Sequence, residues 1–210
     1  MNDLAAFIAA FTTLFVIVDP PGLVPMFIAL TQGSSSAERR SIAIRSCLTA
    51  AALMLAFLFL GEAVLGFVGI SMPAFRIAGG ILLFITALEM LFQRRQTRKQ
   101  NSADEGAAEH QDDPSVFPLA MPLIVGPGAI TTIILLSGPA SGPADYAFVA
   151  AVMLSVLLCV FLAFLSGGSI ERALGKTGIN ILTRVLGMLL AALSVQFVLD
   201  GIQQSFGIGV

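Results

Sequence analysis

The sequence predicts an all-α integral membrane protein, on the basis of its charge content, its apolar runs and its paired proline-rich segments. Of the 210 residues, 57% are hydrophobic and 11% are charged, whereas a soluble domain is typically about 25% charged. This composition excludes an ordinary water-soluble enzyme and a disordered chain. The net charge of −2 gives no reason to expect a nucleic-acid partner.

Six segments have the roughly 20 mostly apolar residues that a membrane-spanning helix needs. They are residues 4–30, 42–60, 74–92, an uncharged stretch within 115–144, 146–166 and 179–199. The first segment has no basic residues before it and no small-residue cleavage site, so we expect it to be retained rather than removed as a signal peptide. Cys47 and Cys159 lie within apolar runs, where we expect small buried side chains rather than a disulfide.

The basic residues predict how the chain is oriented. If the six segments alternate in direction, one side of the membrane holds most of the cations. These are Arg39, Arg40, Arg94, Arg95, Arg98, Lys99, Arg172 and Lys176, with Arg45 and Arg184 at helix ends. The other side holds only Arg76. The positive-inside rule makes the first side cytoplasmic, so both termini are expected outside and the polar loop 93–114 inside. His110 in that loop is expected to be solvated, and we expect no metal or cofactor.

The two halves of the chain resemble each other at offsets of 107 to 109 residues. The matching pairs are IVDP at 17–20 with IVGP at 124–127, EAVLGFVGI at 62–70 with ERALGKTGI at 171–179, and RIAGGILL at 76–83 with RVLGMLLA at 184–191. We therefore predict a duplication, with repeats at 1–92 and 115–210. Three helices in each repeat make the second repeat enter from the opposite side. Inverted repeats are typical of secondary transporters, although a duplicated bundle without transport has the same pattern.

Two spans carry clusters of proline and glycine that favour broken helices. The first is DPPGLVP at 19–25, and the second is PLAMPLIVGPGAITT at 118–132. Proline lacks an N–H and clashes with the preceding turn, and paired breaks in two repeats point to a binding site. The alternative is a pair of kinks used only for packing. The candidate substrate or ion contacts at the breaks are Asp19, Pro20, Gly22, Gly126, Pro127, Gly128, Thr131 and Thr132. We expect free N–H groups near Pro20–Gly22 and near Gly128 to attract anionic groups.

Several polar residues in the spans have two interpretations each. Asp19 either caps the half-helix that follows it or holds a cation or proton, and Gly126 at the matching place makes any charged site asymmetric. Arg76 and Arg184 are repeat equivalents that either extend to the interface or pair with a carboxylate or a helix end. Glu89 has Arg45 and Arg94 as candidate partners. Gln196 is read as an interior polar residue that either joins helices or contacts substrate.

The chain resembles the MarC family of bacterial inner-membrane proteins. The matching stretches include DPPGLVPMFIALT at 19–31, AERR at 37–40, GISMPAFRIAGGILL at 69–83, FPLAMPLIVGPGAITT at 117–132 and GMLLAALSVQFVLDGI at 187–202. The resemblance implies six helices in a bacterial plasma membrane and kinship with LysE-type exporters of amino acids, metabolites and ions. Many members look like DPxGNxP at the first motif, whereas this chain has Leu23 in place of that Asn.

Three classes of function follow from these features. The first is a small-molecule transporter, an exporter, that alternates access around the two broken helices. The second is a non-transporting interaction protein that docks a partner through the loop 93–114, and the third is a passive channel. The sequence has no P-loop, no zinc pattern and no GxSxG, so we expect no enzymatic activity. A small homo-oligomer is compatible with a chain of this size.

Overall fold

In a computed structural model, which describes residues 4–92, 114–138 and 142–207, the chain folds into helices. The first half contains α1 (Leu4–Val18), α2 (Pro20–Leu30), α3 (Ser36–Val68) and α4 (Met72–Leu91). The second half contains the π-type helix η1 (Ser115–Ile124), α6 (Pro127–Ser137), α7 (Pro143–Leu165) and α8 (Gly167–Phe206). The all-α prediction is confirmed. Among the described residues, five helical stretches are long and apolar enough to cross a membrane, and the bent pair of η1 and α6 makes a sixth candidate span.

Two helices are longer than their apolar runs predicted. The helix expected at 42–60 begins at Ser36, because Ser35 and Glu38 form a capping box. The Glu38 N–H donates to Ser35 Oγ at 3.3 Å, and the Ser35 N–H donates to Glu38 Oε2 at 2.7 Å. The helix expected at 179–199 starts at Gly167, and a non-helical Gly175 interrupts it. Most of the predicted polar loop, 93–113, lies outside the described residues, as do His110 and Arg94.

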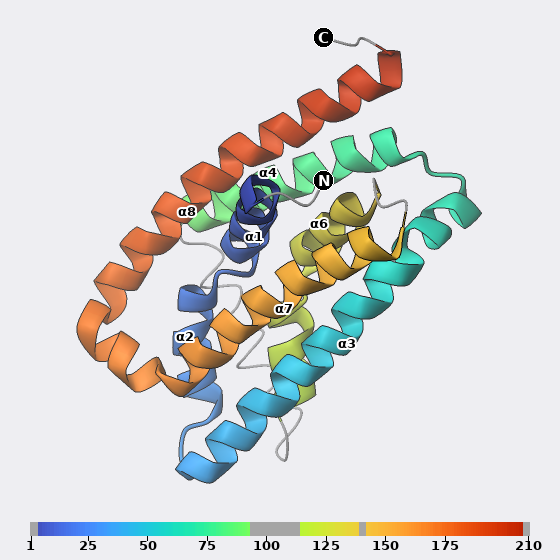
Figure 1. The fold of residues 1–210 in the computed structure, drawn as a ribbon. Helices are drawn as coiled ribbons and strands as arrows, with labels where there is room; N and C mark the ends of the chain where they lie inside the picture. The colour runs from blue at the N-terminus through green and yellow to red at the C-terminus, as the bar shows by residue number, and fades with distance from the viewer. Residues whose placement is uncertain (1–3, 93–113, 139–141, 208–210) are drawn as a thin grey trace.

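The broken helix of each half packs against helices of the other half. In Figure 1, α3 lies on one flank of the bundle and α8 runs beside α4 on the other, with α6 and α7 between them. The first broken helix, α1 with α2, packs on α7 of the second half. The second broken helix, η1 with α6, packs on α3 of the first half. In the same way α2 contacts α8, and α6 contacts α4. The core of the protein is therefore shared by both halves.

The most extensive contact in the described bundle joins α4 to α8. It brings glycines of each helix against the backbone of the other, and the close pairs are Gly201 with Pro73, Gly80 with Ser194, and Gly187 with Ala87. A Cβ added at any of these glycines would lie 2.8–3.3 Å from the partner's carbonyl oxygen. The pairs advance by seven residues along α4 while they retreat by seven along α8, so the two helices run antiparallel. Small residues permit such close approach inside a membrane.

Candidate functional site

The first break is built by Asp19, which separates α1 from α2. Its backbone adopts the left-handed conformation, with φ 58° and ψ 62°, a region where Asp and Asn are enriched among residues other than glycine. Its side chain is only 1% exposed, and Oδ1 accepts the Gly22 N–H at 3.2 Å. Any side chain at position 22 would collide with the Asp19 carboxylate, so the cap requires glycine there. The predicted cap by Asp19 is confirmed, and a cation or proton site at the same carboxylate stays a prediction.

This cap corrects one expectation about the first break. Free N–H groups were expected around Pro20–Gly22, where they would attract an anion. Pro20 and Pro21 occupy the first two helical positions and have no N–H. Asp19 accepts the next two donors, through Oδ1 from Gly22 and through its backbone carbonyl from Leu23 at 3.1 Å. The start of α2 therefore offers no free donor to an anion. The chain also remains helical through Pro25, which lies inside α2.

The second oxygen of Asp19 connects the break to the other half of the protein. Thr183 Oγ1 on α8 donates to Asp19 Oδ2 over a long 3.5 Å, and both side chains are buried. No feature near Thr183 in the sequence predicted this contact, because the two residues are 164 positions apart. The carboxylate thus lies between the start of α2 and α8, away from solvent, where an acidic group is costly and usually functional.

The second break lies between η1 and α6, whose axes differ by 62°. Non-helical backbone at Phe117 and Met121 precedes the break, and Gly126 occupies the N-cap position of α6. No side chain in the described part of the chain caps this helix, in contrast to the first break. A Cβ at Gly128 would lie 3.2 Å from Ile17 Cγ2 and 3.3 Å from Leu83 Cδ2. The start of α6 therefore lies against the end of α1 and the middle of α4.

The two threonines predicted to line the second break are both buried. The Thr132 hydroxyl donates to the Gly128 carbonyl at 2.9 Å, one turn earlier on the same helix. The Thr131 methyl group lies so close to Gly79 on α4 that a Cβ at position 79 would collide with it. Both threonines thus help to pack α6, and Thr131 brings α6 against α4. A substrate contact at either residue stays a prediction.

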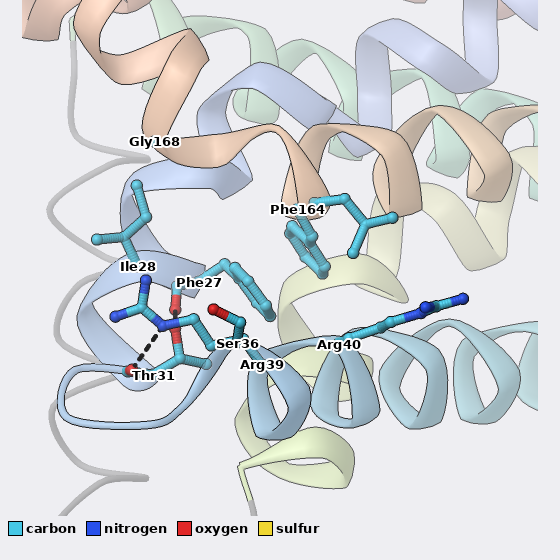
Figure 2. Close-up of a pocket in the computed structure, with 9 residues that line it drawn as sticks. Phe27, Ile28, Thr31, Ser36, Arg39, Arg40, Phe164 and Gly168 are labelled. Carbon is cyan, nitrogen blue, oxygen red and sulfur yellow. Dashed lines mark hydrogen bonds between the residues drawn. The ribbon is translucent and has the colours of Figure 1, made fainter.

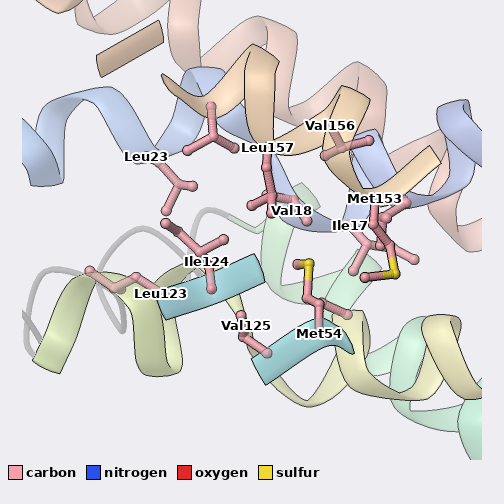
Figure 3. Packing of buried hydrophobic residues seen from close by; sticks show 14 of the residues in the cluster. Ile17, Val18, Leu23, Met54, Leu123, Ile124, Val125, Met153, Val156 and Leu157 are labelled. Carbon is pink, nitrogen blue, oxygen red and sulfur yellow. The ribbon is translucent and has the colours of Figure 1, made fainter. Parts of the chain in front are cut away.

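Buried apolar side chains lie directly before both breaks. Figure 3 shows Val18, just before the first break, and Val125, just before the second, in one packed cluster with Leu23 and Met54. Each of these four side chains is at most 1% exposed. Asp19 at the first break is buried, whereas Pro122 and Pro127 beside the second break are exposed and Gly126 is half-buried. A solute therefore reaches Asp19 only if helices that pack against the first broken span move apart.

The other predicted polar residues lie at different places. Gln196 was expected inside the bundle, and that position is wrong: its side chain is exposed and donates to Asp200 Oδ1 at 2.7 Å, four residues later on α8. The repeat equivalents Arg76 and Arg184 differ, since Arg184 is exposed and Arg76 is half-buried. Arg76 Nε is buried without a hydrogen-bond partner among the described residues. Glu89 is half-buried near the end of α4.

Metal and disulfide chemistry find no support in the described part of the chain. Across residues 4–92, 114–138 and 142–207, no group of three or more His, Cys, Asp or Glu side chains could hold a metal ion. Cys47 and Cys159 are both free, and each is half-buried rather than fully buried as the sequence predicted. The candidate site therefore consists of the buried Asp19 carboxylate, the Thr183 hydroxyl that donates to it, and the backbone at the start of α6, which has no side-chain cap among the described residues.

These features define a polytopic α-helical membrane protein whose first and fourth predicted spans are broken. The comparisons with known proteins give the family, because residues 4–206 match the profile described as MarC family integral membrane protein. The chain therefore belongs to the MarC family, as its motifs indicated.

Similar proteins carry the name UPF0056 membrane protein. One from Methanocaldococcus jannaschii is 40% identical over 201 residues, covering 96% of this chain and 98% of the relative. YhcE of Escherichia coli is 35% identical over 97% of this chain and 95% of its own length. YvbG of Bacillus subtilis is 35% identical over 93% of each chain. No solved structure matches significantly.

Proposed function

We propose that this protein is a small-molecule transporter, an exporter, which alternates access around the two broken helices. The observation that carries the proposal is the buried Asp19 at the first break, which contacts α8 of the other half, together with a second break at the matching place. Breaks at membrane depth are tolerated where protein or a water-filled cavity satisfies the backbone. In secondary transporters, paired breaks of this kind hold the substrate and the coupling ion. We assign the protein no catalytic activity.

We propose that the two halves are inverted repeats. The contacts between the halves support this, because α1 and α2 pack on α7 of the second half while the corresponding η1 and α6 pack on α3 of the first half. The contacts of α2 with α8 and of α6 with α4 correspond to each other in the same way. The antiparallel register of α4 and α8 is also the one that a two-fold axis in the membrane plane requires of equivalent helices. Such an axis passes between these helices and relates the two breaks.

The two breaks have different chemistry, and we propose different roles for them. Asp19 holds the coupling cation or proton, since it is the charged group at the breaks and is shielded from water. Uptake of a cation or proton weakens the acceptance of hydrogen bonds from Gly22 and Thr183, and this loosens α2 from α8. The start of α6 has no side-chain cap among the described residues, so it suits an anionic group of the substrate.

We propose that both termini are outside and that the loop 93–114 is cytoplasmic in an inner-membrane protein. The basic residues support this orientation. The turn between α2 and α3, which precedes Arg39 and Arg40, then faces the cytoplasm, and the turn between α3 and α4 faces the periplasm. An exporter in this orientation takes up its substrate from the side that carries the arginines.

A thermal-shift screen of the purified protein in detergent tests the binding site. The probes are amino acids, organic acids, nucleosides, antibiotics and metal ions, each alone. A ligand at about 100 times its dissociation constant stabilises a two-state fold by roughly 2.7 kcal/mol. We expect one class of probe to raise the melting temperature, and this increase to be smaller in Asp19→Asn and in Gly128→Ala. Matched controls are Asp200→Asn, a carboxyl group away from the breaks, and Gly66→Ala, where a Cβ meets nothing within 4 Å.

The outcomes separate the classes of function. A shift that is lost in the two break variants and kept in the two controls supports the site. A shift that is equal in all four variants places the ligand elsewhere and refutes the site. If no probe shifts a folded sample, capture of a protein partner through the loop 93–114 becomes the leading alternative.

A further inference from the structure

The end of the bundle that carries Arg39 and Arg40 contains a pocket that the proposed transport site does not use. Its volume is about 180 Å³, and it lies where α2 and α7 end and where α3 and α8 begin. Figure 2 shows Arg39 and Arg40 reaching out on either side of Ser36, with Phe27 and Phe164 above them. The pocket therefore combines two cations, a hydroxyl group and an aromatic surface.

Arg39 is held in place at this pocket by the turn that precedes it. Its Nε donates to the Thr31 carbonyl at 3.2 Å, and the Thr31 hydroxyl donates to the Phe27 carbonyl at 2.7 Å. Within the described residues, no hydrogen bond occupies the two terminal nitrogens of the Arg39 guanidinium. A guanidinium fixed through Nε presents its terminal N–H groups in one direction. This geometry suits the oxygens of a phosphate, which arginine binds with paired hydrogen bonds.

The charge at the pocket is positive. No Asp or Glu is among the described residues that line it. The nearest acidic residue along the chain is Glu38, whose Oε2 already accepts the Ser35 N–H at 2.7 Å in the capping box. Arg39 therefore faces an anion without a competing carboxylate in the pocket, and Arg40, on the other side of Ser36, adds positive charge at the same end of the bundle. A phosphate group with one or two negative charges suits the positive charge at this pocket.

The remaining surface of the pocket is apolar and opens at a helix end. Phe27 and Phe164 stack with centroids 4.2 Å apart and planes at 6°, which gives the pocket a rigid wall. Leu165 is 49% exposed, and Ile28 is partly exposed beside it. Exposed apolar side chains next to arginines at the end of membrane-spanning helices match the boundary between headgroups and acyl chains. A phosphate that carries acyl chains uses both surfaces, whereas free phosphate uses only the arginines.

We propose that this pocket binds the phosphate group of an anionic phospholipid headgroup. Arg39 holds the phosphate oxygens, Arg40 attracts the headgroup by its charge, and the acyl chains run along Leu165 and Ile28. Anionic lipids attract basic residues at the membrane surface by about 1 kcal/mol per cation. The bound lipid joins the end of α2 to the start of α3, and so it is placed to stabilise the half-helix that begins at Asp19.

Lipid titration of the full-length protein in detergent tests this inference. The probes are phosphatidylglycerol, phosphatidylcholine with the same acyl chains, and inorganic phosphate, and the readout is the melting temperature against probe concentration. We expect phosphatidylglycerol alone to raise the melting temperature with saturation. Arg40→Gln and Arg39→Gln should each weaken its apparent affinity about fivefold. Arg184→Gln, which removes an exposed arginine elsewhere, should leave the affinity unchanged.

Each outcome bears on the inference. Equal shifts from the two lipids, or an unchanged affinity in both Arg39→Gln and Arg40→Gln, would overturn it. A saturable shift with inorganic phosphate that depends on both arginines would also overturn the lipid as the ligand and would assign the pocket to a soluble phosphate compound. Arg40→Gln guards against a misfolded Arg39 variant, because the Arg40 side chain is exposed.

Discussion

Gly80→Ala tests whether α4 and α8 approach as closely as the structure indicates. A Cβ at position 80 would lie 2.8 Å from the Ser194 carbonyl oxygen and 3.1 Å from the Val198 nitrogen. These are backbone atoms, which cannot rotate away as the end of a side chain can, so the helices must separate. Overpacking of this kind costs about 1–3 kcal/mol. Replacing glycine by alanine also stabilises a helix by about 0.5–1 kcal/mol, because alanine loses less backbone entropy on folding. We expect a net loss of about 0–2.5 kcal/mol against the parent, and of about 1–3 kcal/mol against a glycine-to-alanine change that meets no close contact.

The assay is reversible unfolding of purified protein in mixed micelles with increasing SDS, followed by circular dichroism. Gly66→Ala is the matched control, because Gly66 lies in α3, is exposed, and has no atom within 4 Å of the added Cβ. We expect the control to be unchanged or slightly more stable than the parent. If Gly80→Ala is as stable as Gly66→Ala, the close antiparallel contact of α4 and α8 is refuted, and with it the register that supports inverted repeats.

Three further predictions concern the first break, the aromatic stack and the orientation. Asp19→Ala should lower the free energy of unfolding by about 1–3 kcal/mol, because alanine neither caps α2 nor tolerates a left-handed backbone. Asp19→Asn keeps both properties and should lower it by less than about 1 kcal/mol. Equal losses in the two variants would contradict the cap. Phe27→Leu should cost about 0.5–1.5 kcal/mol in lost stacking, and this loss should vanish when Phe164→Leu is already present. In a cysteine-free background, an impermeant thiol reagent should label Ile70→Cys from outside and Gln32→Cys only in inside-out vesicles; the reverse pattern would contradict the orientation.

The spans and the breaks could be predicted because their causes are local in the sequence. Apolar runs of sufficient length define the spans, and proline next to glycine defines the breaks near Asp19 and Gly126. The true start of α3 was also readable, since Ser35 and Glu38 form the S-x-x-E pattern of a capping box. The apolar run alone placed this start six residues too late, because it marks the hydrocarbon core rather than the helix.

The contacts between distant segments could not be predicted in the same way. Thr183 approaches Asp19 only because α8 packs on α2, and no local pattern marks such a residue. The stack of Phe27 on Phe164 depends equally on the packing of α2 against α7. Gln196 was misplaced because a single polar residue in an apolar span does not reveal which face of the helix is buried. The side of α8 that faces α4 is set by Gly187 and Gly201, and Gln196 lies off that side.

The measurement that tests alternating access most directly is the chemical accessibility of Val125, which requires no knowledge of the substrate. Val125 precedes the second break and is 1% exposed. The variant Val125→Cys, with Cys47 and Cys159 replaced by alanine, is treated with a small impermeant thiol reagent in right-side-out and in inside-out vesicles. Leu190→Cys, fully buried within α8, reports exposure by general unfolding. We predict that Val125→Cys reacts from both faces and faster than Leu190→Cys. Reaction from one face only, or no faster than Leu190→Cys, would contradict alternating access around the breaks.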